Sequence, residues 1–181
     1  MIQSKADLDR YVKADLAIVG ITRWRLWMGL RYPLLRYQRI LRKTEYAVNC
    51  TRGPLRKPYV FLRQYLLRRA GMKLGFTIHP NIFGPGLSIA HWGTIVINPN
   101  VRIGANCRIH PSTSLGEYKG GSPQLGDDCY IGPGAKLFGP ITLGDRVKIG
   151  ANAVVTKSFP SDVVLRGIPA DIVKPRVPEG N

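Results

Sequence analysis

Three histidines are the side chains of this sequence best suited to move a proton at neutral pH. They are His79, His91 and His110, and successive histidines lie 12 and 19 residues apart. An unperturbed imidazole has a pKa of about 6.5, so each can act as a base or an acid in this range. Neither separation is the short H-x4-H spacing of one known kind of zinc site. We therefore expect no metal ion.

A short repeat must position these histidines. Leu, Ile or Val recurs every six residues over 97–115 and again over 125–155. The recurring anchors are Ile97, Ile103, Ile109, Leu115, Leu125, Ile131, Leu137, Leu143, Ile149 and Val155. Four places after nine of these anchors stands a second small or apolar residue, namely Val101, Cys107, Thr113, Cys129, Ala135, Ile141, Val147, Ala153 or Phe159. A period of six predicts a parallel β-helix, with both series pointing inward.

The register of the repeats distinguishes one histidine from the other two. His79 and His110 each directly follow an aliphatic anchor, so their side chains should point outward and be structural or peripheral. His91 lies in an eight-residue step between two anchors, where the register slips. A side chain in such a slip can be directed at a site instead of stacking in the coil. A second interruption, the polar and glycine-rich segment 116–124, predicts a loop that walls a substrate pocket.

Three cysteines, Cys50, Cys107 and Cys129, are an odd number, which argues against a disulfide framework. Two of them occupy inward positions of the repeat, where a small thiol packs as a hydrophobic group. We expect all three to be reduced and structural.

The basic residues concentrate in the first part of the chain. Residues 1–73 hold 17 Lys and Arg against 4 Asp and Glu, while the remaining 108 residues hold 10 against 7. Periodic apolar residues predict helices over 4–19, over 23–43 with a break or kink at Pro33, and over 59–72. Such basic helices either pack on the solenoid with solvated arginines or lie on an anionic bilayer. Nucleic acid is the least favoured partner, because no recognised binding motif accompanies the charge.

The sequence divides into a basic helical segment over 1–73, a solenoid over 74–175 and a tail over 176–181. No run of about 18 apolar residues predicts a membrane-spanning helix. The opening residues, MIQSKADLDRY, carry charges where a signal peptide needs an apolar core. We therefore expect a cytoplasmic protein, with peripheral contact at the inner face of the cytoplasmic membrane if the basic helices bind lipid.

The repeats resemble those of a known family. I-G-P-G-A-K (131–136) and I-G-A-N-A-V (149–154) are similar to the hexapeptides of the left-handed β-helix acyltransferases. The run 75–175, with G-I-P-A at 167–170, resembles the catalytic half of serine acetyltransferase and of its relatives in capsule and exopolysaccharide gene clusters. The resemblance implies a mainly β fold, a left-handed parallel β-helix of hexapeptide repeats with an N-terminal α-helical segment. It also implies a homotrimer with active sites between neighbouring solenoids.

The resemblance also implies a mechanism. His91, in the stretch A-H-W-G-T, matches the catalytic histidine of the family and would be the general base. It would deprotonate the acceptor hydroxyl as the oxygen attacks the thioester of acetyl-CoA in a ternary complex, with backbone N–H groups holding the oxyanion. No cysteine stands beside a histidine, so a covalent acyl-enzyme is not favoured.

Further site residues follow from the same resemblance. The CoA contacts would be Gly116 near the thioester, Ala135 and Ala151 along the pantetheine arm, and Lys157, Arg166 and Lys174 at the phosphates. The expected acceptor-binding residues are Thr77, His79, Trp92 and Ser122.

Departures from the serine acetyltransferase pattern bear on the acceptor. Thr77 stands where the family pairs an Asp with the catalytic histidine, and Ala90 replaces the acid that meets the serine ammonium. The stretch G-G-S-P (120–123) has no match for the basic pair that binds the serine carboxylate. A site without these partners should discriminate poorly for a free amino acid.

These departures predict an O-acetyltransferase that acts on a sugar hydroxyl of a polysaccharide, glycan or glycolipid precursor, closest to the capsule relatives. The alternative is a serine O-acetyltransferase with an altered acceptor site. A third possibility is a non-catalytic scaffold or membrane-binding module. The presence of His91 and of the G-I-P-A motif argues against it.

Overall fold

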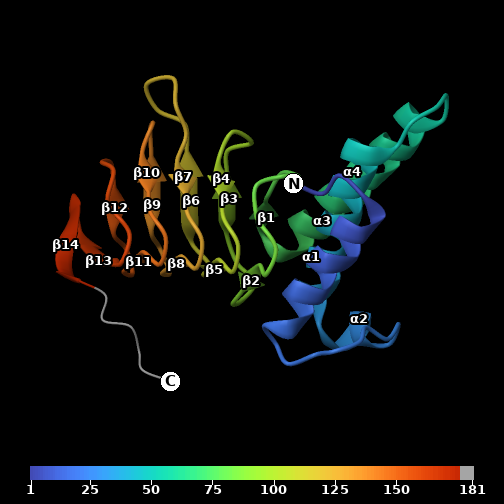
Figure 1. Ribbon diagram of the computed structural model, residues 1–181, viewed down its shortest axis with the longest axis horizontal. Coiled ribbons are helices and arrows are strands. Elements are labelled where there is room, and N and C mark those ends of the chain that lie inside the picture. Colours follow the sequence, from blue (N-terminus) through green and yellow to red (C-terminus); the bar gives the residue numbers. More distant parts are fainter. Residues whose placement is uncertain (176–181) are drawn as a thin grey trace.

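The computed structural model describes residues 1–175, the last two by their backbone alone, and its larger part is a parallel β-helix (Figure 1). Three sheets stack along it, in the strand orders β1-β3-β6-β9-β12, β10-β7-β4 and β14-β13-β11-β8-β5-β2. The strands are β1 (Phe76–Thr77), β2 (Ser88–Ile89), β3 (Ile95–Ile97), β4 (Arg102–Ile103), β5 (Arg108–Ile109), β6 (Thr113–Gly116), β7 (Gln124–Leu125), β8 (Tyr130–Ile131), β9 (Lys136–Phe138), β10 (Thr142–Leu143), β11 (Lys148–Ile149), β12 (Val154–Val155), β13 (Val163–Gly167) and β14 (Ala170–Pro175). The predicted mainly β solenoid with an N-terminal helical region is confirmed.

The strand pairing between neighbouring coils brings equivalent anchors of the six-residue repeat into register. Ile97 pairs with Leu115, Leu115 with Leu137, and Leu137 with Val155, so equivalent anchors stack along one sheet. All ten anchors of the repeat are buried, and so are all nine residues of the second inward series. The segment 116–124 carries the extra residues of the long step between Leu115 and Leu125 as a loop, after which the register resumes.

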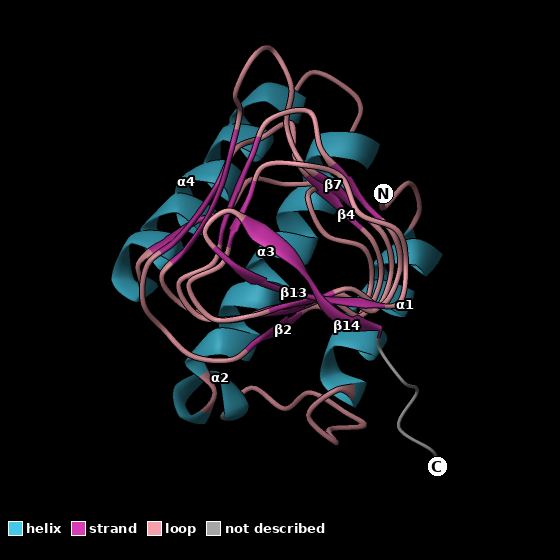
Figure 2. Ribbon diagram, turned by 90° about the vertical axis from the view of Figure 1, so that its left-hand side faces the viewer, coloured by secondary structure: helices cyan, strands magenta, loops and turns pink. Residues whose placement is uncertain are grey.

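Four helices form the N-terminal part of the chain. They are α1 (Lys5–Ala17), α2 (Met28–Arg31), α3 (Pro33–Cys50) and α4 (Arg56–Leu74). Ser4 caps α1 as its side-chain oxygen accepts from the Asp7 N–H at 3.0 Å. The expected break at Pro33 is present: α2 ends at Arg31, and Pro33 opens the first turn of α3, where a missing N–H costs nothing. Figure 2 looks along the coils and shows α3 behind them, with α4 and α1 to either side.

A buried cluster of charges joins the helices to the first coil. The fully buried side chain of Arg42 donates to Asp15 at 2.8 Å and to Glu45 at 3.1 Å. Its remaining N–H groups donate to the carbonyls of Phe83 and Gly84 in the first coil, at 2.9 and 2.7 Å. Every hydrogen-bonding direction of the guanidinium is thus used, which is the condition for burying a charge.

Two further predictions concern cysteines and membrane spans. Cys107 and Cys129 are buried and Cys50 is partly buried, and all three are free thiols, as expected. Across residues 1–175, no helix combines the length and the apolar character that crossing a bilayer requires.

Candidate active site

Close backbone contacts fix the turn that carries His91, between β2 and β3. The Gly93 N–H donates to the Leu74 carbonyl at 2.9 Å, which ties the turn to the end of α4. Gly93 has a φ of +132°, and a Cβ there would lie 2.9 Å from the Cβ of Pro111 in the next coil. Gly75, which ends α4, approaches so closely that its own added Cβ would lie 2.9 Å from the Gly93 carbonyl. Only glycine fits at both positions, so the backbone around His91 is held between α4 and the neighbouring coil.

His91 is exposed and lies close enough to His110 of the next coil for their charges to interact, as does Arg108. Burial lowers the pKa of His110, and the positive charges of Arg108 and then of His91 lower it further. The His110 ring packs against Tyr130 with 5.0 Å between centroids. Its buried Nε2 has no hydrogen-bond partner among the described residues. The residue expected to be peripheral therefore belongs to the surroundings of the candidate base.

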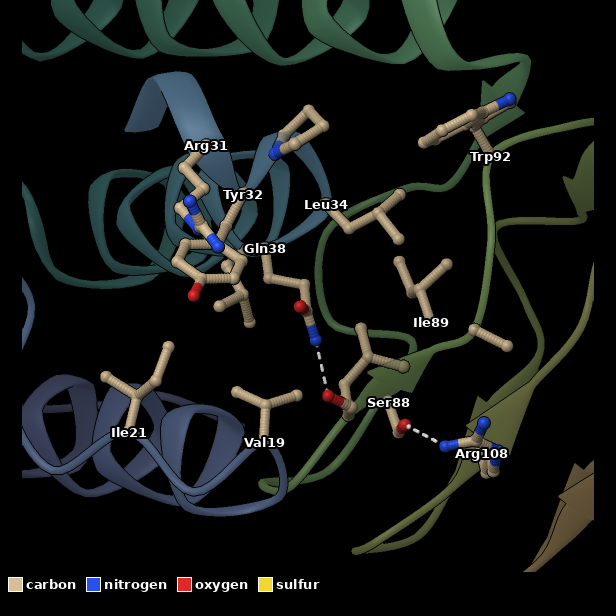
Figure 3. A pocket seen from close by; sticks show the side chains of 14 residues that line it. Val19, Ile21, Arg31, Tyr32, Leu34, Gln38, Ser88, Ile89, Trp92 and Arg108 are labelled. Carbon is tan, nitrogen blue, oxygen red and sulfur yellow. Dashed lines mark hydrogen bonds between the residues drawn. The ribbon is translucent and has the colours of Figure 1, made fainter. Parts of the chain in front are cut away.

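A cavity of about 420 Å³ opens beside this turn, between the helices and the first coil (Figure 3). Ala90 and Trp92, the two neighbours of His91, form part of its wall. Arg31 and Arg108 stand at opposite ends of the cavity. Most of the remaining wall is aliphatic, formed by Val19, Ile21, Leu34, Leu35, Leu87 and Ile89.

The polar groups of this cavity favour an anionic ligand. Gln38 donates its amide N–H to the Leu87 carbonyl, and Arg108 donates to the Ser88 hydroxyl at 3.2 Å. The described lining holds two arginines and neither Asp nor Glu. A guanidinium in such a wall offers paired N–H donors of the kind that bind a carboxylate.

Three of the four predicted acceptor-binding residues lie outside this cavity. Thr77 and His79 line a different one, together with Met72 and Pro80. The Ser122 hydroxyl is nearly buried and donates to the Asn98 side chain at 3.3 Å. Only Trp92 lines the cavity beside His91.

The predicted CoA contacts are spread along the coils. Gly116 ends β6 and packs on the ring of Phe138. Ala151 is exposed in the turn after β11, whereas the Ala135 side chain is fully buried in the interior, so Ala135 could meet CoA only through its backbone.

The charged members of the predicted CoA set lie at the end of the solenoid. Lys157 and Arg166 are exposed, and Lys157 pairs with Asp171 at 3.3 Å. The side chain of Lys174 and the tail 176–181 lie outside the described residues. Within residues 1–175, no group of three or more His, Cys, Asp or Glu is placed to hold a metal ion.

Sequence reasoning did not single out Arg31 and Arg108, which line the cavity beside His91. Arg108 precedes the anchor Ile109, and that outward position in the repeat was the available signal. Arg31 gave no such signal, because it comes from α2, which packs against α3, and no local pattern reveals that this helix end reaches the cavity.

Comparisons with known proteins show which families have similar sequences and structures. The family model for bacterial transferase hexapeptide (six repeats) matches residues 122–157. A serine acetyltransferase of Staphylococcus xylosus is 42% identical over 105 residues, which cover 55% of this chain and 49% of that protein. One of Helicobacter pylori is 35% identical over 123 residues, which cover 65% of this chain and 72% of that protein.

A solved structure agrees with these relatives. A serine acetyltransferase in complex with CoA superposes with a TM-score of 0.76 at 27% identity, over 94% of this chain and 72% of that one. The chain spans about half the length of the relatives from S. xylosus and Mycobacterium tuberculosis.

The prediction of a sugar acceptor and of a closest relationship to capsule enzymes is wrong on these comparisons. The relatives at 42% and 35% identity are serine acetyltransferases, which favours the alternative acceptor and removes the support for a role in polysaccharide biosynthesis or for a glycan partner. The prediction rested on the missing family pattern for a carboxylate, and it did not take into account that Arg31 and Arg108 line the cavity beside His91. The chain, a β-helix of hexapeptide repeats, belongs to the serine acetyltransferase family.

Proposed function

We propose that this protein is a serine O-acetyltransferase, which moves the acetyl group of acetyl-CoA to the hydroxyl of serine. The observation that carries the proposal is His91, presented on a fixed turn beside a cavity with two arginines and no carboxylate in its described lining. The family supports the donor, because one solved relative is a complex with CoA.

His91 acts as the general base of a direct transfer. Its imidazole takes the proton of the serine hydroxyl as the oxygen attacks the thioester carbonyl carbon. Backbone N–H groups of the coil hold the resulting oxyanion. Collapse of the tetrahedral intermediate breaks the C–S bond, and the leaving CoA thiolate recovers the proton from the imidazolium.

Arg108 binds the serine carboxylate. Arg108 and His91 both lie close enough to His110 to lower its pKa, so the guanidinium and the base share one small region. The described wall offers no acid to the serine ammonium. Selectivity therefore depends more on the carboxylate than on the amino group.

The remaining expectations are proposals of the same kind. Gly116, Ala151 and the backbone of Ala135 line the pantetheine arm, while Lys157 and Arg166 meet the CoA phosphates. The protein is a cytoplasmic homotrimer with sites between neighbouring solenoids, as is common among hexapeptide-repeat enzymes.

Release of free CoA from acetyl-CoA tests the proposal, with serine, ethanolamine and 3-hydroxypropionate as acceptors. Serine should support release, and His91→Ala should lower the rate by about 10²- to 10⁴-fold, the usual contribution of a general base. Ethanolamine, which lacks the carboxylate, should be a poorer acceptor than 3-hydroxypropionate, which lacks the ammonium. Acetyl-CoA binding without release in the presence of serine would refute a serine acceptor, and an active His91→Ala protein would refute the assigned base.

A further inference from the structure

A second cavity, of about 610 Å³, lies away from His91, between α4 and the start of α3. Three cations line it, Arg36 from α3 and Arg69 and Lys73 from α4, and no acidic residue does. Its other walls include Leu30, Tyr65 and Leu66. The cavity is therefore amphipathic, with fixed positive charge and a hydrocarbon wall.

The cations of this region have no internal counter-charge. Of the 17 lysines and arginines in residues 1–73, only Lys5, Arg10 and Arg42 pair with a carboxylate within the described part of the chain. All four acidic residues of the segment take part in those pairs. Within residues 1–175, Arg69 contacts Tyr65, to whose hydroxyl it donates at 3.3 Å and over whose ring it lies. The cavity thus presents charge that is left for an external anion.

Exposed apolar side chains occur in the wall of the cavity and along the segments that form it. Leu30, in its wall, is 86% exposed, and Leu26, just before α2, is 93% exposed. On α4, the side chains of Phe61, Tyr65, Arg69 and Lys73 follow one another at four-residue spacing, so they lie along one stripe of the helix. Only Leu67 and Gly71 of the 19 residues of α4 are buried, which leaves this stripe open. Figure 2 shows α4 along the outside of the helical layer, with α2 beyond its end.

We propose that this cavity binds the phosphate headgroup of an anionic phospholipid, and that α2 and α4 thereby dock on the surface of an anionic membrane. Such a bilayer offers phosphates to the cations and hydrocarbon to the exposed leucines at adjoining depths. A second copy of the chain related by a two-fold axis would instead bring the same cations against one another. Nucleic acid would match the charge of Arg36 and Lys73 but would leave Leu26 and Leu30 in water.

Vesicle sedimentation tests the proposal with the full chain. Vesicles of phosphatidylglycerol and phosphatidylcholine in equal parts should bind it, vesicles of phosphatidylcholine alone should not, and salt should weaken the binding. Arg36→Gln/Arg69→Gln/Lys73→Gln should lower the partition coefficient by about a hundredfold, because each basic residue near an anionic surface contributes about 1 kcal/mol. The matched control, Lys13→Gln/Arg52→Gln/Lys119→Gln, loses the same charge from exposed positions that do not line the cavity.

A second variant, Leu26→Ser/Leu30→Ser, distinguishes the apolar contact with the bilayer from the attraction between cations and phosphates. It should weaken binding at every salt concentration, and because both side chains are exposed it should fold normally. Equal binding by the two triple variants would overturn the headgroup site, and so would the absence of binding to anionic vesicles. A fall in oligomeric mass of the Arg36/Arg69/Lys73 variant without lipid would show an interface between copies instead.

Discussion

Arg42 Nε lies 2.8 Å from Asp15 Oδ2, and this fully buried ion pair joins α3 to α1 at the end of the solenoid. Asp15 in turn accepts from the N–H groups of Gly86 and Leu87, at 3.0 and 2.9 Å, so the same carboxylate reaches the first coil. Because Leu87 also lines the cavity beside His91, this cluster ties α1 and α3 to the part of the first coil that forms the cavity wall.

Replacing that cation should be severely destabilising. Arg42→Met leaves Asp15 and Glu45 buried without a counter-charge, and removing one partner of a buried pair costs about 3–5 kcal/mol of the free energy of unfolding. Urea denaturation followed by circular dichroism measures the loss. The matched control is Arg10→Met, which breaks the exposed pair with Asp7 and should leave the stability nearly unchanged. Similar midpoints for both variants would mean that the buried cluster does not hold the joint.

Gly93→Ala should damage catalysis more than stability. The new Cβ would need to displace Pro111 from 2.9 Å, and moving the turn moves His91. A shift of about 1 Å in a catalytic group can cost up to about a hundredfold in rate, read here as kcat for CoA release. Gly53→Ala is the control, because Gly53 also has a positive φ, of +89°, but nothing lies within 4 Å of the added atom. The assignment of the turn fails if Gly93→Ala retains full kcat.

Arg108→Gln should raise the pKa of His110. A nearby cation disfavours the protonated imidazole, so its removal favours protonation, although burial still keeps the pKa below the unperturbed 6.5. An NMR titration of the His110 ring protons measures the change. The same variant should raise the KM for serine by about tenfold or more, the cost of losing a hydrogen bond to a charged group. Arg102→Gln, one strand earlier and also exposed, should change neither quantity.

The two solenoid cysteines should be inert at neutral pH in the folded protein. Burial raises the pKa of Cys129 to about 11 and also raises that of Cys107 well above its ordinary value. The thiolate is the reactive form, and a raised pKa lowers its fraction at every lower pH. Iodoacetamide at pH 7 should therefore modify only Cys50, as read by mass spectrometry, until urea unfolds the chain. Equal labelling of Cys107 and Cys50 in the native protein would contradict the packed interior.

The solenoid was predictable because the direction of each side chain depends on its place in a short repeat of the sequence. Each coil repeats one strand-and-turn unit, so Ile97 and Leu137 reveal their inward direction by spacing alone. The slip around His91 was predictable for the same reason, as a departure from the period.

The helical layer and the acceptor site were not predictable in this way. The contact of Arg42 with Phe83 and the approach of Arg31 to the cavity join segments far apart in the sequence, and no period links them. The acceptor was misjudged because a resemblance carries residues at fixed positions, whereas a carboxylate can be met by an arginine from any element that reaches the site. The role of each site residue remains a prediction.

The strand β14 limits aggregation between copies of this protein through their sheet edges. A stack of parallel coils ends in unpaired N–H and C=O groups, on which another chain could add a further coil and begin a fibre. In this chain β14 folds back antiparallel on β13 and occupies that edge of its sheet, while the helices lie against the first coil at the opposite end. Beyond β10, Phe159 pairs with Leu143 and exchanges backbone hydrogen bonds with Thr142 and Gly144, so that edge is occupied as well. The sheet that ends in β12 has no further paired strand within residues 1–175, so end-to-end aggregation should start from its edge.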